Sequence, residues 1–190
     1  MIFWYGARGT FSKLSQENPK TWDNYIEWSK LNHLTELILL DSGLNEDLVE
    51  VNFDNIDIDD WKFIVIDGSF QTGFYTTVEY VLRNIKAKNT FNFLTVVKEP
   101  RERCESITIN DFEFVGNELL DNDYSNSALT NCGGFDETFS TSDLNKFGLI
   151  DNYEKAYDIR ERLSENNPED RHADCNVIAV WRHKTIGREL

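Results

Sequence analysis

A cysteine, a histidine and an aspartate in the second half of the chain are the residues best suited by type to covalent chemistry. Cys132 lies in the glycine-rich stretch 131–134, whose backbone N–H groups could bind an oxyanion, and His172 and Asp174 follow about 40 positions later. A thiolate nucleophile needs a base within hydrogen-bond distance and an acceptor that orients the base. These three residues are therefore the catalytic candidates. The spacing matches no protease or transferase pattern, so a buried thiol beside a tight turn is the alternative.

The same region holds potential zinc ligands. His172 and Cys175 have the spacing of half a zinc site, and His183 or Cys132 could add a further ligand. A structural zinc site needs a second half with matched spacing, which the sequence lacks. We therefore expect no bound zinc.

A third pattern is Asp67-Gly68-Ser69, directly after the apolar run 63–66. In open sheets, ligands bind beyond the carboxyl ends of parallel strands, and the following helix could bind an anion. No glycine-rich phosphate-binding pattern is present, and an aspartate that caps a turn explains Asp67 equally well. The acidic stretch 57–60 lacks the spacing of a calcium loop. We expect no cofactor.

Acidic residues outnumber basic ones, and their distribution along the chain is uneven. The 190 residues include 34 Asp and Glu against 19 Lys and Arg, which gives a formal net charge of −15. Segments 31–61 and 104–145 contain no lysine or arginine and together hold 18 of the 34 acids. Such a surface repels phosphate backbones and anionic membranes and attracts basic proteins. We therefore expect a basic protein partner, and no direct contact with nucleic acid or a membrane.

The acids that we predict to bind this partner lie in polar stretches of these two segments. A structural explanation stands beside this one, because charge along an edge strand, as predicted for 45–60, prevents strand-to-strand aggregation. Acidic residues also keep a protein in solution. The predicted partner-binding residues are Glu46, Asp47, Asp54, Asp57, Asp59, Asp60, Asp121 and Asp123.

The composition is that of one folded domain spanning residues 1–190. Hydrophobic residues make up 40% of the chain, with 13 Phe, 7 Tyr and 5 Trp to fill a core. No apolar run approaches the roughly 18 residues of a membrane helix, and stretch 1–9 lacks the basic-then-apolar order of a secretion signal. Three cysteines without paired spacing favour a reducing compartment. These features predict a cytoplasmic protein.

Hydrophobic periodicity predicts the elements that would position these residues. Asn18-Pro19 is typical of a helix start, and Asp151 with Glu154 forms a capping-box-like pair at the start of another helix. The run 177–180 is apolar on both faces, which indicates a central strand. Strands are predicted at 2–5, 37–40, 63–66, 91–97, 107–114, 127–131 and 175–182, and helices at 19–32, 75–86 and 151–165.

This order predicts an α/β or α+β fold with a mixed sheet and helices packed on it. Its parallel portion would be the strand–helix–strand unit formed by 63–66, 75–86 and 91–97. Two functional hypotheses follow. The first is a non-enzymatic acidic protein that masks a basic partner, as toxin-immunity proteins and nucleic-acid mimics do. The alternative is a small cysteine- and histidine-dependent enzyme, or an α/β domain that binds a small ligand.

Overall fold

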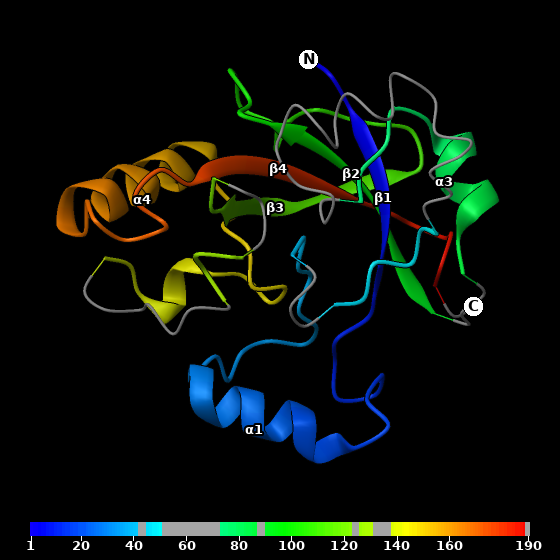
Figure 1. Ribbon diagram of the computed structural model, residues 1–190, viewed down its shortest axis with the longest axis horizontal. Helices are drawn as coiled ribbons and strands as arrows, with labels where there is room; N and C mark the ends of the chain where they lie inside the picture. The colour runs from blue at the N-terminus through cyan, green and yellow to red at the C-terminus, as the bar shows by residue number, and fades with distance from the viewer. Residues whose placement is uncertain (42–44, 51–72, 87–89, 123–125, 131–137, 189–190) are drawn as a thin grey trace.

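The computed structural model describes residues 1–41, 45–50, 73–86, 90–122, 126–130 and 138–188. Within these residues, four strands form one sheet in the order β1-β2-β4-β3, and every neighbouring pair is antiparallel (Figure 1). The described part is therefore an α+β mixture. Its elements are β1 (Trp4–Gly9), α1 (Pro19–Ser29), α3 (Val78–Asn84), β2 (Phe91–Lys98), β3 (Phe112–Leu120), the 3-10 turn η2 (Thr141–Asp143), α4 (Tyr153–Asn166) and β4 (Asn176–His183).

The prediction that part of the sheet is parallel is wrong. β2, which would be the second strand of the parallel unit, pairs antiparallel with β1 on one side and with β4 on the other. The run 63–66, which would be the first strand, lies outside the described residues. Periodicity identifies β2 as a strand but does not specify its partners. Those partners come from the two ends of the chain, so sequence order gave no guide to them.

β4 confirms the prediction of a central strand. It lies between β2 and β3, and residues 177–183 are all buried. Its side chains alternate between two cores, because Ala179 and Trp181 pack with Phe93 and Phe112, whereas Ile178 and Val180 pack elsewhere. A strand covered on both faces must be apolar throughout, which explains the uninterrupted run in the sequence.

The predicted helices at both ends of the chain are present. α1 begins as expected, with Pro19 in the first turn and the Asn18 side chain accepting a hydrogen bond from the Lys20 N–H at 3.1 Å. α4 begins one residue later than predicted, because Asn152 rather than Asp151 is the cap and accepts from the Lys155 N–H at 2.9 Å. Both helices therefore owe their start to an asparagine side chain.

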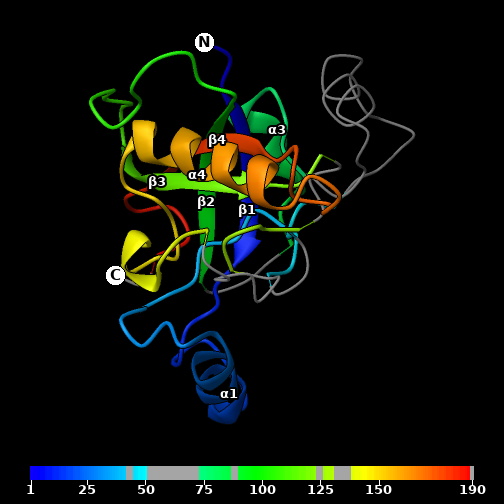
Figure 2. The same ribbon diagram turned by 90° about the vertical axis from the view of Figure 1, so that its left-hand side faces the viewer.

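The helices surround the sheet on different sides. Figure 1 shows α4 and α3 at opposite ends of the sheet and α1 below it, and Figure 2 shows α4 lying across the front of the strands. Ala156, Ile159 and Leu163 of α4 enter the same buried cluster as Trp22 and Tyr25 of α1. Val81 of α3 instead joins the cluster around Trp181. The start of β4, at Val177, therefore packs in the same core as α4 and α1, whereas α3 packs in a different core near the end of β4.

Several shorter elements differ from prediction. The run 37–40 is buried as expected, but it forms no strand and pairs with Phe11 only through one isolated bridge at Leu37. β3 begins at Phe112, so most of the predicted strand 107–114 is irregular, and Ser127 contributes only an isolated bridge to Leu120. Among the described helices, none has the length and apolar character needed to cross a membrane.

Candidate functional site

The predicted catalytic group is not assembled by the described residues. Cys132 lies outside them. His172 is buried and its Nδ1 lies 2.8 Å from the Asp170 carboxylate, which also accepts the His172 backbone N–H at 2.8 Å. These contacts lower the pKa of Asp170, the backbone hydrogen bond contributing most. Asp174 is exposed, and Asp170 rather than Asp174 contacts the imidazole. The acceptor that orients His172 is thus a residue that the sequence pattern missed.

The potential zinc ligands do not come together as a set: His172 and Cys175 share one turn, but Cys132 lies outside the described residues and His183 lies elsewhere. His183 packs among the rings of Phe93 and Phe112, with centroids at 5.8 and 4.9 Å, and burial lowers its pKa. Cys175 lies at the start of β4, where burial raises the pKa of its thiol to about 12. No group of three or more His, Cys, Asp or Glu suited to a metal ion occurs within the part of the chain that the structure describes.

Three of the predicted partner-binding acids are described, and each has a basic neighbour. Asp47 lies 3.1 Å from the guanidinium of the buried Arg8. Asp121 is paired with Arg171 at 2.5 Å, and Glu46 lies 3.9 Å from the Lys86 ammonium. The basic partners all come from outside the two base-free segments. The other five acids, Asp54, Asp57, Asp59, Asp60 and Asp123, lie outside the described residues.

Further acids of these segments are also neutralised or buried. Arg182 of β4 pairs with Glu36 and Glu113, both at 2.9 Å, and Lys155 pairs with Asp143 at 2.6 Å. The Glu118 side chain is fully buried, and its pKa is raised well above the usual value, mainly by desolvation. Within the described residues, the two segments are therefore not a continuous bare acidic face.

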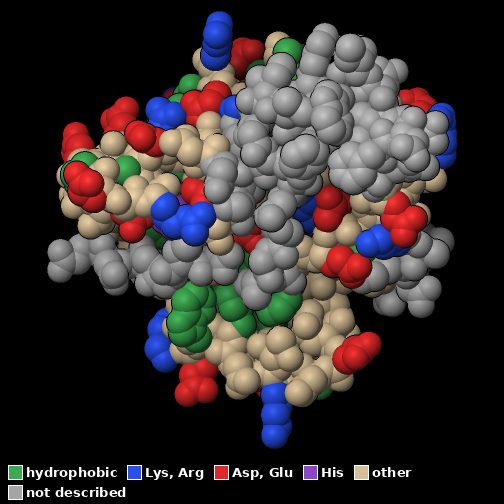
Figure 3. All heavy atoms as spheres, in the orientation of Figure 1, with side chains coloured by type: hydrophobic (Ala, Val, Ile, Leu, Met, Phe, Trp, Pro, Cys, Tyr) green, Lys and Arg blue, Asp and Glu red, His purple; other side chains and the backbone are tan. Residues whose placement is uncertain are grey.

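One group of unpaired acids lies around the second half of α4 and the loop that follows it. Figure 3 shows acidic side chains, with basic ones among them, at the end of the molecule where Figure 1 places α4, and further acidic side chains at the opposite end. Four acids in this region are exposed. None of the four has an ion pair or a side-chain hydrogen bond with a described residue. We call these four the α4 acids: Glu161, Glu165, Glu169 and Asp174.

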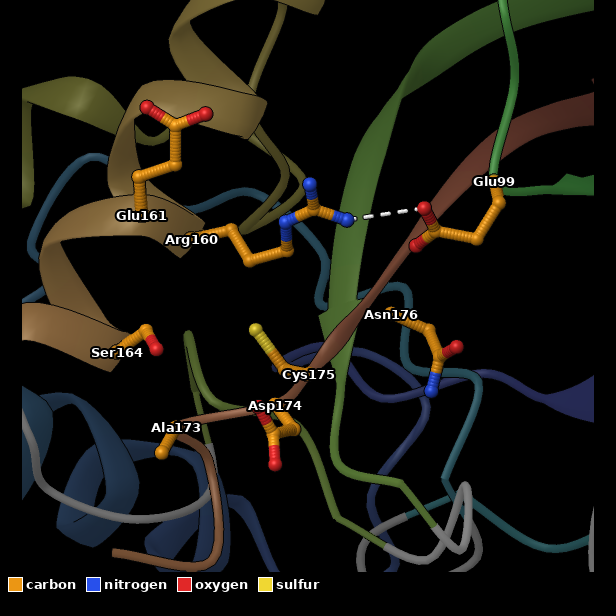
Figure 4. Close-up of a pocket in the computed structure, with 8 residues that line it drawn as sticks. All are labelled: Glu99, Arg160, Glu161, Ser164, Ala173, Asp174, Cys175 and Asn176. Carbon is orange, nitrogen blue, oxygen red and sulfur yellow. Dashed lines mark hydrogen bonds and ion pairs between the residues drawn. The ribbon is translucent and has the colours of Figure 1, made fainter. Parts of the chain in front are cut away.

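A hollow of about 430 Å³ lies between α4 and the start of β4, beside these acids. Two of the α4 acids, Glu161 and Asp174, are on its rim (Figure 4). Its volume falls in the lower part of the range of ligand pockets, which suits one side chain or a small molecule. The eight residues that line it are Glu99, Arg160, Glu161, Ser164, Ala173, Asp174, Cys175 and Asn176.

One wall of the hollow is a bridge between Glu99 and Arg160. Glu99 follows β2 in a left-handed conformation with φ 44°, and one carboxylate oxygen accepts the Val177 N–H at 2.7 Å. The other oxygen accepts from the Arg160 guanidinium at 2.9 Å, drawn as the dashed line in Figure 4. The Arg160 guanidinium also lies 4.5 Å from the centre of the Tyr157 ring. Among the described residues that line the hollow, the one cation, Arg160, is therefore already paired.

The acidic end escaped the sequence analysis because its acids alternate with arginines. Segment 158–174 contains Arg160, Arg162 and Arg171, so it is not a base-free run. In the fold, however, each arginine has a partner other than the α4 acids: Glu99, Asp158 and Asp121 respectively. The sequence signal that could have found these acids is the pairing of opposite charges four residues apart on a helix. This rule pairs Asp158 with Arg162 and leaves Glu161 and Glu165 without a base.

Comparisons of this chain with models of known protein families, with curated proteins and with solved structures found no match in any of the three.

Proposed function

We propose that this chain is a non-enzymatic binding protein that uses the acidic end around α4 to bind and mask a basic protein partner. The observation that carries the proposal is the four α4 acids, which have no countercharge among the described residues, beside a hollow with no free cation in its described lining. Exposed carboxylates without a basic partner attract a complementary positive surface and accelerate its association. The formal net charge of −15 adds a long-range attraction of the same sign.

The class of partner follows from this charge. A toxin or a nucleic-acid-binding protein that presents a basic active surface would be blocked when that surface is covered by carboxylates. Direct binding of nucleic acid is opposed by the same charges, and so is docking to an anionic membrane. The chain has only three cysteines, and the two described ones, Cys104 and Cys175, form no disulfide, which favours a cytoplasmic setting for this interaction.

The described thiols give no support to the enzymatic alternative. Burial raises the pKa of Cys104 to about 11 and that of Cys175 to about 12, so neither is a thiolate at neutral pH. Glu102 and Glu105 strengthen this effect at Cys104. Among the described residues, neither thiol has a hydrogen bond with a histidine, so binding is the better-supported activity.

Neutralising the α4 acids tests the proposal. The variant Glu161→Gln/Glu165→Gln/Glu169→Gln/Asp174→Asn is expected to bind a lysine- and arginine-rich peptide about tenfold or more weakly, since each exposed charge pair contributes about 0.2–1 kcal/mol. Isothermal titration calorimetry at 50 mM and 300 mM salt measures the affinity. The wild-type affinity should fall at the higher salt concentration.

A matched control removes four other exposed glutamates and the same amount of charge. Glu17, Glu27, Glu50 and Glu79 are exposed, have no ion pair among the described residues, and lie on or beside α1 and α3. The control with glutamine at all four should retain most of the wild-type affinity. Equal losses in the two variants would mean that only net charge matters, and the proposed surface would be wrong.

A further inference from the structure

The outer side of α1 carries a line of exposed side chains. The apolar side of this helix, which includes Trp22 and Tyr25, is buried in the core. On the opposite side, exposed residues follow each other at spacings of four and three, which a helix brings into line. Trp28 is exposed beside this line. We call the four residues the α1 stripe: Lys20, Asn24, Glu27 and Trp28.

The two charges of the α1 stripe are not neutralised within the described part of the chain. Neither Lys20 nor Glu27 has an ion pair with a described residue. They lie two helical turns apart, whereas oppositely charged residues pair on a helix at spacings of three or four. The neighbouring acid, Asp23, is already paired with Lys13 at 2.9 Å. The stripe therefore presents one unpaired positive charge and one unpaired negative charge.

The end of the molecule that holds α1 is electrically balanced. Figures 1 and 2 show α1 below the sheet and apart from the strands, and Figure 3 shows basic as well as acidic side chains there. Residues 10–33 contain three lysines and three acids, a formal charge of zero, although the whole chain carries −15. A second copy of the chain therefore meets less repulsion at α1 than its net charge implies.

The α1 stripe is complementary to itself. In a two-fold pair, two antiparallel copies of α1 bring together residues that lie equally far from the centre of the contact. With this centre beside Asn24, Lys20 of one copy lies opposite Glu27 of the other, and the same pair recurs across the axis. Glu17 and Lys30, which are both exposed, flank the stripe in the same register. Opposite charges therefore meet along the whole contact.

Trp28 supplies the apolar part of this contact. Its side chain is 53% exposed, and its ring centre lies 5.9 Å from that of the buried Tyr25. In the antiparallel pair, Trp28 of one copy lies beside Lys20 of the other, whose methylene groups and ammonium both interact favourably with an aromatic ring. Tryptophan is also enriched among the residues that dominate binding energy at interfaces.

We propose that two copies of this chain associate through α1, antiparallel about a two-fold axis beside Asn24. This inference is independent of the proposed function, because none of the α4 acids belongs to the α1 stripe. Two helices of about 16 Å bury less than the roughly 1,200 Å² of a standard interface, so the association is weak. We expect a dissociation constant on the order of 0.1 mM.

Charge reversal tests the pairing. Sedimentation equilibrium of the full chain, from about 10 µM to 1 mM, measures the fraction of dimer. Lys20→Glu and Glu27→Lys each place like charges opposite each other twice, and each should weaken association about tenfold or more. The double variant Lys20→Glu/Glu27→Lys should dimerise as the wild type does. An equimolar mixture of the two single variants should also dimerise, because each supplies the charge that the other lacks.

The controls separate this pairing from effects on folding and on net charge. Both reversals favour the helix, since glutamate near its start and lysine near its end complement the dipole, so lost association would not reflect a lost α1. Lys184→Glu, at an exposed position after β4, changes the net charge as Lys20→Glu does and should leave the dimer nearly unchanged. Trp28→Ala should weaken the dimer about tenfold.

Three outcomes would overturn the α1 dimer. The first is a wild type that remains monomeric at the highest concentration. The second is a double variant or a mixture that associates no better than the single variants. The third is an equal loss of association in Lys184→Glu and Lys20→Glu, which would show that net charge alone controls association. The binding of basic peptides at the α4 acids is unaffected by any of these results.

Discussion

At the scale of single residues, the most unusual group is the carboxyl of Glu118 in β3. One oxygen accepts from the Ser127 hydroxyl at 2.8 Å and from the Leu119 N–H at 2.9 Å, while the other oxygen has no hydrogen-bond partner among the described residues. The groups that face it include Asp41 and Tyr25, which are acids, and no described cation pairs with it. Burial first, and then Asp41, raises the pKa of Glu118 well above 4.5. Both effects favour the protonated, neutral form of this carboxyl in the folded protein.

Replacing Glu118 with glutamine should stabilise the protein at neutral pH. The unfolded chain releases the Glu118 proton near pH 4.5, whereas the folded chain keeps it, so wild-type stability is full below that pH and falls as the pH rises towards the folded pKa. Each pH unit in this window costs about 1.4 kcal/mol. Glutamine keeps the acceptor for Ser127 and does not titrate. The variant should exceed the wild type by about 1 kcal/mol or more at pH 7.5, measured by urea unfolding.

The comparison at low pH is the control for that substitution. At pH 4, both states of the wild type are largely protonated at this position, so the two proteins should have similar free energies of unfolding. A constant difference between pH 4 and pH 7.5 would show that Glu118 does not change its proton binding on unfolding.

At the scale of elements, the start of α4 depends on one side chain that the sequence did not single out. Asn152 caps the Lys155 N–H, while Asp151 accepts from the Asn145 side chain at 2.6 Å and stays exposed. Asn152→Ala should lower the free energy of unfolding by about 1 kcal/mol, since it leaves a helix N–H without an acceptor. Asp151→Ala should cost less. Guanidinium denaturation of both variants measures the difference. A larger loss of unfolding free energy for Asp151→Ala than for Asn152→Ala would show that Asp151, and not Asn152, is the cap.

The elements that could be predicted are those whose signal is local. Asn18-Pro19 marks the start of α1, and the two-sided apolar run in β4 requires a central position. Strand pairing depends on long-range contacts, so the sequence did not show that β2 lies between β1 and β4. The run 37–40 is equally apolar and equally buried, and its side chains alternate between two cores, but it does not join the sheet. Burial was predictable there, and hydrogen bonding was not.

At the scale of the whole molecule, a segment that lacks basic residues in the sequence can still have basic neighbours in the fold, and a segment that contains them can still present unpaired acids. The segments without bases receive their countercharges from β1, β4 and α4, through Arg8, Arg182 and Lys155. The unpaired α4 acids, in contrast, come from a segment with several arginines. The partner-binding surface could therefore not be located from runs of charge. Its hollow could not be predicted either, because Glu99 and Arg160 meet only when β2 ends beside α4.

An acidic surface retained for binding should cost stability, and α4 allows a test of this. Glu165 is the residue before the last of α4, whose final turn has no basic residue, and Glu161 lies one turn earlier. Carboxylates repel each other at this spacing and interact unfavourably with the carboxyl end of the helix dipole, by about 0.2–1 kcal/mol. Glu161→Gln/Glu165→Gln should therefore raise the melting temperature by about 1–3 °C at low salt, while it weakens binding of the basic peptide.

Glu154→Gln, in the first turn of the same helix, is the control and should lower the melting temperature, because Glu154 pairs with Arg103 and lies at the favourable end of the dipole. If the double variant were less stable than the wild type, these two acids would have a structural role, and their effect on binding would follow from a disturbed helix rather than from lost charge.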